Sequence, residues 1–122
     1  MEEYKLGLVE AKFADIVWSH APIGTKELVV ACESELNWKR TTTYTVLKKL
    51  CERGIFQMEN STVTVVIGKA DFYAMQGERL IEENYGGSLP AFLAAFTSRK
   101  QLSGEEIAEI RRMIDAYEEG KS

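Results

Sequence analysis

The chain has 122 residues, 45% of them hydrophobic and 28% charged, and a formal net charge of -4 at pH 7. This balance is typical of one ordinary globular domain, or of a small domain with an accessory element, and excludes a disordered chain. No apolar run approaches the roughly 18 residues of a membrane span. The acidic N-terminus, MEEYKLGLVE, lacks the basic and apolar regions of a signal peptide. We therefore expect a cytoplasmic protein.

Residue types that carry catalysis or bind metals are scarce. His20 is the only histidine, and the two cysteines, Cys32 and Cys51, form no CxxC pair. This spacing argues against a zinc site and favours two small hydrophobic side chains buried on helices. The chain also has no glycine-rich phosphate loop and no nucleophile-base motif. We expect no metal, no cofactor and no enzymatic activity.

Three helices are predicted in the first half. Apolar residues recur at helical spacing over residues 8–19, and Pro22 then breaks the helix. Thr25 is predicted to be the N-cap of a second helix, TKELVVACESE. A third helix covers residues 37–53 and ends at Gly54. The inward-facing residues of the second helix are predicted to be Leu28, Val29 and Cys32.

The pattern then changes to that of strands. Residues 55–67, IFQMENSTVTVVI, are rich in Val, Ile and Thr, with a polar centre at Glu59-Asn60-Ser61, and predict a two-stranded hairpin. Three helices followed by a hairpin is the order of a winged helix-turn-helix. We therefore expect a mainly α fold with a small β-hairpin. It comprises a winged-helix DNA-binding domain over residues 1–69 and a helical dimerisation region over residues 70–122.

Three further helices are predicted in the second half. Asp71 is expected to cap a helix that runs through Asn84, and a Gly-Gly pair then interrupts the pattern. Ser88 caps the next helix, LPAFLAAFTSR. Ser103 and Glu106 have the S-x-x-E spacing of a capping box and predict the start of the last helix.

These helices also predict a surface for a partner. Three short helices are too few to enclose a core alone, and large exposed apolar surfaces mark interfaces. We expect a homodimer; the alternative is that the helices fold back on the first domain as a monomer. The residues predicted to form the dimer interface are Ile81, Tyr85, Leu89, Phe92, Leu93, Phe96, Ile107, Ile110 and Ile114.

The third helix, NWKRTTTYTVLKKLCER, has the character of a DNA-reading element. It carries five Lys and Arg residues against Glu52 alone, in a chain that is acidic as a whole. A helical projection predicts one buried stripe, made of Thr43, Val46, Leu47 and Leu50. The opposite face presents hydroxyls and cations, which suit base edges and phosphates in a major groove. The residues predicted to bind double-stranded DNA are Lys39, Arg40, Thr41, Thr42, Tyr44, Thr45, Lys48, Lys49 and Arg53.

The distribution of charge supports this placement. Residues 1–69 hold nine acidic and nine basic side chains, whereas residues 70–122 hold ten and six. The charge run alone fits an ordinary solvated helix face equally well, and it is the order of helices and hairpin that favours DNA binding. An alternative of another class is a winged-helix module that binds a basic protein partner. Steep salt dependence of binding to duplex DNA would separate the two.

Four segments resemble the penicillinase repressor family, which includes the methicillin-resistance regulator and copper-responsive repressors. They are EAKFADIVW (10–18), WKRTTTYTVLKKLCERG (38–54), YGGSLPAFLAAF (85–96) and LSGEEIAEI (102–110). The family's helix typically reads W-x-x-T-T-V-x-T-x-L-x-R-L-x-x-K-G. The residues that match it are Trp38, Thr41, Thr42, Thr45, Leu47, Leu50 and Gly54.

The resemblance implies a homodimeric transcriptional repressor. In such proteins the N-terminal domains bind an inverted-repeat operator, often with a TACA/TGTA core, and the C-terminal helices interlock. Carried over by position, Thr41, Thr42 and Thr45 would face bases or nearby phosphates. Lys49 and Arg53 would face the DNA backbone. Trp38 would buttress the start of the recognition helix.

The chain departs from the family pattern in three places. Family wings usually carry a G-R-x-Y-x-Y strand, whereas residues 61–66 read STVTVV, with Glu59 near the tip and no Lys or Arg between Ile55 and Gly68. This wing is expected to hold phosphate weakly. The Asn-Phe bond that is cleaved in β-lactam-responsive members corresponds to Ala95-Phe96, and the CxC motifs of copper-responsive members are absent. The inducing partner, a sensor protease or a small-molecule signal, is left open by the sequence.

Overall fold

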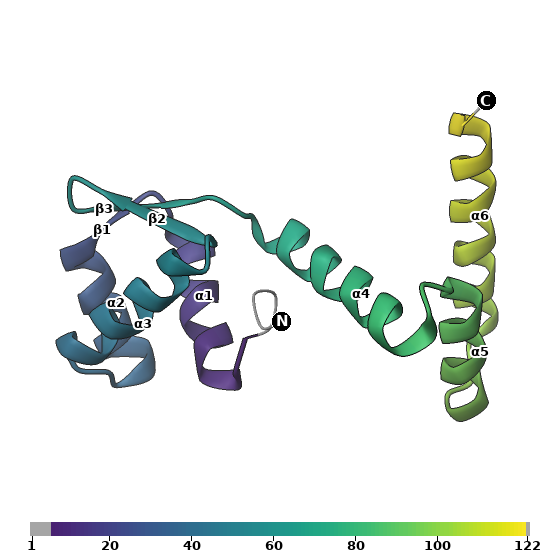
Figure 1. The fold of residues 1–122 in the computed structure, drawn as a ribbon, viewed down its shortest axis with the longest axis horizontal. Coiled ribbons are helices and arrows are strands. Elements are labelled where there is room, and N and C mark those ends of the chain that lie inside the picture. Colours follow the sequence, from purple (N-terminus) through teal and green to yellow (C-terminus); the bar gives the residue numbers. More distant parts are fainter. Residues whose placement is uncertain (1–5, 122) are drawn as a thin grey trace. The chain divides into compact units, whose positions relative to one another are not determined.

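The computed structural model describes residues 6–121, and within that range it contains six helices and three short strands (Figure 1). In chain order the elements are α1 (Leu8–His20), β1 (Ile23–Gly24), α2 (Thr25–Leu36), α3 (Arg40–Glu52), β2 (Phe56–Glu59), β3 (Thr62–Val65), α4 (Lys69–Tyr85), α5 (Leu89–Arg99) and α6 (Gly104–Lys121). Three helices, a β-hairpin and three further helices confirm the predicted winged helix-turn-helix with a C-terminal helical region.

Hydrogen bonds from backbone N–H groups fix the starts of α1 and α2. The Oε1 atom of Glu10 accepts a hydrogen bond from the Gly7 N–H at 3.0 Å, which closes the first turn of α1. The prediction that Thr25 caps α2 is wrong, because Gly24 is the N-cap and Thr25 is the first, buried residue of the helix. The Thr25 N–H instead donates to the Ser61 carbonyl at 2.9 Å, so the start of α2 is tied to the hairpin turn.

The wing is a three-stranded antiparallel sheet with the order β1-β3-β2. The hairpin of β2 and β3 has the predicted position, and its two turn residues, Asn60 and Ser61, both have positive φ angles, of 55° and 61°. Positive φ at both central residues is the requirement of a type I′ hairpin turn. The sequence did not predict β1, in which Ile23 pairs with Val63 and Gly24 with Thr62.

One hydrophobic core holds the N-terminal unit together. The three helices each contribute an inward stripe, and the sheet and α4 close the core from other sides. The Trp18 indole Nε1 donates a hydrogen bond to the Ile67 carbonyl at 3.0 Å, which joins α1 to the segment after the wing. The buried residues are Phe13, Ala14, Ile16, Val17, Leu28, Cys32, Leu47, Leu50, Ile55, Phe56, Val63 and Phe72.

Helix α4 begins earlier than predicted. The Phe72 N–H donates to the Gly68 carbonyl at 2.8 Å, so the helix starts at Lys69 and Asp71 lies within its first turn rather than at its cap. Phe72 is fully buried and its ring lies 5.7 Å from that of Trp18. The first turns of α4 therefore belong to the N-terminal unit. By compactness the chain divides between Arg79 and Leu80, while a functional boundary after residue 69 stays a prediction.

The C-terminal unit contains α5 and α6, which lie side by side (Figure 1). Side chains of both helices line a shared groove. Ser88 caps α5 as predicted, since its Oγ accepts a hydrogen bond from the Ala91 N–H at 3.1 Å. The predicted capping box of α6 is also present: the Glu106 N–H donates to Ser103 Oγ, and the Ser103 N–H donates to Glu106 Oε1. No helix among the described residues combines the length and apolar character needed to cross a membrane.

Candidate nucleic-acid interface

Helix α3 is held in the N-terminal unit by its inward stripe. Thr43, Leu47 and Leu50 are buried and Val46 is half-buried, as the helical projection predicted. The hydroxyl of Thr43 needs a partner in this setting, and it donates to the Lys39 carbonyl at 3.2 Å. With this stripe buried, the rotation of α3 about its own axis is set, and its opposite face is directed to solvent.

Trp38 packs against the core just before α3 begins. Its indole ring stacks on the ring of Phe13, with the centroids 5.6 Å apart and 16° between the planes. Asn37, in the left-handed conformation with φ of 57°, ends α2 and turns the chain toward Trp38. The predicted role of Trp38 as a buttress for the start of α3 agrees with this contact.

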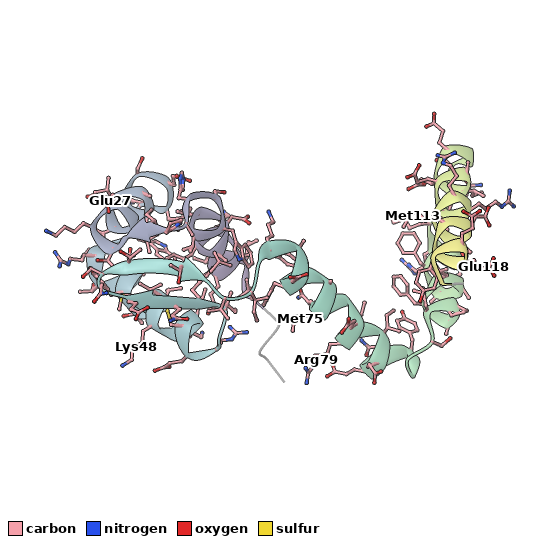
Figure 2. All side chains as sticks on the ribbon, turned by 90° about the horizontal axis from the view of Figure 1, so that it is seen from above. Glu27, Lys48, Met75, Arg79, Met113 and Glu118 are labelled. Atoms are coloured by element: carbon pink, nitrogen blue, oxygen red, sulfur yellow. The ribbon has the colours of Figure 1, made fainter. Side chains whose placement is uncertain are left out.

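The outward face of α3 gathers most of the residues predicted to bind DNA. Thr41, Thr42 and Thr45 are exposed, and Tyr44 is half-buried at the side of the helix. The Arg40 guanidinium lies over the Tyr44 ring, 5.6 Å from its centroid, which directs this cation along the helix. Lys48 extends from α3 away from the body of the N-terminal unit (Figure 2). The face therefore combines hydroxyls in its middle with cations around them.

The N-terminal end of α3 has the properties of an anion site. Lys39 is the N-cap, Arg40 is the first helical residue, and the first turn holds no acidic side chain. A helix N-terminus carries a partial positive charge, so cations there are unfavourable unless an anion joins them. No side chain caps this end of the helix, which leaves backbone N–H groups for a ligand. Two cations and these N–H groups suit a phosphate.

Two of the predicted cations are already paired within the N-terminal unit. Glu10 of α1 lies 2.6 Å from the Lys49 Nζ and 3.7 Å from an Arg53 guanidinium nitrogen. The hydrogen bond from Lys49, followed by that from the Gly7 N–H, lowers the pKa of Glu10 below its ordinary value of 4.5. The Arg53 side chain is only 16% exposed. Lys49 and Arg53 are thus paired with Glu10, whereas no ion pair is found for Lys39, Arg40 or Lys48 among the described residues.

A groove lies between α3 and β2. Its apolar lining is formed by Leu47, Cys51 and Met58, and its polar lining by Tyr44, Lys48 and Glu52. Burial raises the pKa of the Cys51 thiol, so it stays neutral and is a poor nucleophile or metal ligand at pH 7. Within residues 6–121, no three His, Cys, Asp or Glu side chains gather into a group that could hold a metal ion.

The tip of the wing carries no cation. Glu59 is exposed at the end of β2, directly before the turn, and Met58 beside it in sequence is also exposed. A carboxylate at this position would repel a phosphate. If DNA lies along α3, the wing therefore contributes little attraction.

The residues predicted to form a dimer interface lie on the last turns of α4 and on α5 and α6. The centroid of the Phe92 ring lies 5.5 Å from that of Tyr85 and 6.0 Å from that of Phe96. The structure describes the whole of α5, and none of its residues is buried. The exposed large apolar side chains from these helices are Leu80, Leu89, Leu93, Phe96, Ile107, Met113, Ile114 and Tyr117. These side chains remain exposed in the described part of the C-terminal unit.

Two features of this site were not predicted. The pairing of Glu10 with Lys49 and Arg53 joins α1 to the end of α3, and no spacing in the sequence reports such a contact. The sequence also did not predict that the Arg53 side chain would be largely enclosed, at 16% exposure. The sequence predicted a helix over residues 37–53, whereas α3 covers Arg40–Glu52 and Arg53 is its C-cap. The accessibility of Arg53 depends on which helix lies beside it.

Comparison with known proteins agrees with this architecture. The family model described as "Penicillinase repressor" matches residues 6–116. The penicillinase repressor of Bacillus licheniformis is 24% identical over 116 residues, which cover 92% of this chain and 91% of that protein. The methicillin resistance regulatory protein MecI of Staphylococcus aureus strain Mu50 is 18% identical over 116 residues, 92% of this chain and 94% of that protein. MecI of Mammaliicoccus sciuri is 17% identical over the same length.

Proposed function

The chain belongs to the penicillinase repressor family, whose model matches most of its length, and on this basis we propose that it is a dimeric, DNA-binding transcriptional repressor that recognises an inverted-repeat operator through α3. It is a regulatory protein rather than an enzyme. The observation that carries the proposal is the outward face of α3, where solvent-exposed hydroxyls lie between solvent-exposed cations. Because its ligand is the operator, we place the protein in the cytoplasm.

The proposal assigns different roles to the two kinds of side chain on α3. The hydroxyls and methyl groups of Thr41, Thr42 and Thr45 suit base edges and thymine methyl groups in the major groove. The charges of Lys39, Arg40 and Lys48 suit phosphates on either side, which fix the register of the helix on DNA. The Tyr44 ring supports Arg40. Lys49 and Arg53 belong to the same set of cations but are paired with Glu10.

A homodimer follows from the uncovered apolar surface of α5 and α6. A surface with this many exposed apolar side chains lowers its free energy by meeting a second copy of itself. A two-fold dimer presents two copies of α3, and two equivalent helices read an inverted repeat. A signal that separates the two subunits, whether a sensor protease or a small molecule, would weaken binding because the two half-sites would no longer be held together.

Selection from a random pool of duplexes tests this function and assumes no particular operator sequence. We expect repeated rounds of binding and amplification to enrich an inverted repeat whose half-sites lie about one helical turn, or a multiple of it, apart. Enrichment of no sequence, together with tight binding to a basic protein ligand, would instead support the protein-binding alternative.

The same experiment supplies the duplex on which the face of α3 is tested. Thr45→Val removes a hydroxyl while keeping the size and branching of the side chain. We expect it to weaken binding to the selected duplex by about 1–3 kcal/mol and to leave binding to a scrambled duplex unchanged. An equal loss on both duplexes would mean that this position does not read bases.

A further inference from the structure

The carboxylate of Glu10 binds two cations at the C-terminal end of α3. It contacts the Lys49 Nζ at 2.6 Å and an Arg53 guanidinium nitrogen at 3.7 Å. Carboxylate and phosphate oxygens are recognised by the same cationic donors at the same distances. A DNA phosphate that approaches this end of α3 must therefore share these cations with Glu10 or displace it.

We propose that Glu10 is an internal competitor for DNA phosphate, which withholds Lys49 from the duplex and thereby limits sequence-independent binding. This inference rests on the function proposed above and names a residue outside α3 that sets the strength of the interaction. It leaves base reading to the threonine face, because Glu10 contacts no residue of that face.

The Glu10 side chain is held more firmly than the Lys49 side chain. This difference favours competition with phosphate over a fixed structural bridge. Glu10 is held by α1, its side chain is 19% exposed, and the Gly7 N–H donates to it. The Lys49 side chain is 58% exposed on a flexible four-carbon stem. Lysine is therefore the partner that moves, and a phosphate within its reach can exchange with the carboxylate.

Lys48 provides the matched comparison on the same turn of α3. It is exposed like Lys49, but it has no ion-pair partner among residues 6–121. The two adjacent lysines thus have the same charge and lie on the same helix, but only Lys49 is paired with Glu10. Any effect of Glu10 that acts through pairing should depend on Lys49 and not on Lys48.

The test is a set of variants measured on a selected duplex and on a scrambled duplex at several salt concentrations. Glu10→Gln removes the charge, and a glutamine at this position can still accept the Gly7 N–H. We expect Glu10→Gln to bind both duplexes about two- to fivefold more tightly, the scale of a partly exposed ion pair. The slope of log affinity against log salt should become steeper by about one unit, as for one additional phosphate contact.

Measuring Glu10→Gln in different lysine backgrounds shows whether Glu10 acts through its pairing with Lys49. Glu10→Gln should tighten binding equally in the wild-type and Lys48→Ala backgrounds and should have no effect in the Lys49→Ala background. A gain of the same size in all three backgrounds would reflect only the change in net charge and would overturn the proposal. Weaker binding by a folded Glu10→Gln protein, as judged by circular dichroism and urea unfolding, would also overturn it, because Glu10 would then support the DNA-bound state.

The outcomes distinguish this inference from the proposed function. If the wild-type protein binds duplex DNA with a clear salt slope but the effect of Glu10→Gln does not depend on Lys49, only the role of Glu10 fails. If the wild-type protein binds no duplex DNA, both proposals fail. Nuclear magnetic resonance titration of the Glu10 carboxyl group reports the pairing without DNA: its pKa should rise in Lys49→Ala and stay lowered in Lys48→Ala.

Discussion

The ring of Trp38 stacks on the ring of Phe13, with centroids 5.6 Å apart and planes inclined by 16°. Phe13 is fully buried in α1, and Trp38 is the second residue before α3. The contact fixes where α3 begins relative to the core. The residues that follow directly, Lys39 and Arg40, are the cations at the proposed phosphate site, so their positions depend on this stack.

Trp38→Ala should therefore affect both stability and DNA binding. Removing a large, half-buried aromatic side chain is expected to lower the free energy of unfolding by about 2–3 kcal/mol, and to weaken binding because the start of α3 is released. Trp38→Phe should lower the free energy of unfolding much less, since a ring remains to stack on Phe13. Urea unfolding followed by circular dichroism measures the difference. Equal stability of the Ala and Phe variants would show that the stack does not hold the helix.

Ile114→Asp tests the proposed dimer. Ile114 is 55% exposed on α6, so a charge at this position should leave the folded chain largely intact but oppose burial against a second copy. We expect the wild-type protein to sediment at micromolar concentration with about twice the chain mass of 13.8 kDa, and the variant to shift toward the monomer. Glu118→Asp, on the same helix (Figure 2), is the control and should remain dimeric. A monomeric wild-type protein at high micromolar concentration would contradict the proposal.

Acid should weaken the contribution of Glu10 to stability. Its pKa is lowered in the folded protein, so the ionised form is favoured there and stabilises the fold at pH values above the ordinary pKa of 4.5. Glu10→Gln should therefore be less stable than the wild type by about 0.5 kcal/mol at neutral pH. The difference should shrink as the pH falls below 4.5 and through the lowered pKa of Glu10. Glu33→Gln, which removes an exposed carboxylate from α2, is the control. A difference that does not change with pH would mean that charge is not the cause.

A substitution at the tip of the wing is expected to strengthen DNA binding rather than weaken it. Glu59 is an exposed carboxylate beside the hairpin turn, and surface charges act over about 8–10 Å at moderate salt. Glu59→Lys should tighten binding to specific and scrambled duplexes alike and make it more sensitive to salt, and Glu59→Gln should do so more weakly. Titrations on both duplexes at two salt concentrations measure the effect. Unchanged affinities and slope would show that the wing tip does not approach DNA.

Periodicity and capping residues made most of the helices predictable. The burial of Thr43, Leu47 and Leu50 follows from the 3.6-residue period of α3. The starts of α5 and α6 follow from Ser88 and Ser103, whose hydroxyls accept backbone hydrogen bonds close by in sequence. Such features can be predicted from neighbouring residues alone, without knowing which distant segment packs against the helix.

Contacts between distant segments could not be predicted in the same way. β1 has only two residues, and its pairing with β3 joins positions about forty residues apart, so no local period reveals it. Its presence also moved the cap of α2 from Thr25 to Gly24. The pairing of Glu10 with Lys49 has the same non-local origin. A single sequence predicts which residues face outward, but not which of the outward cations another helix will neutralise.

If the exposed face of α3 binds duplex DNA, the charge of Lys48 should contribute to binding in a salt-dependent way. The measurement is the affinity of the wild-type protein and of Lys48→Ala for a duplex as salt is raised. We expect log affinity to fall linearly with log salt for the wild type, and Lys48→Ala to bind more weakly with a slope shallower by about one unit. Binding that is absent at low salt, or that has the same slope with and without Lys48, would contradict DNA binding by this face of α3.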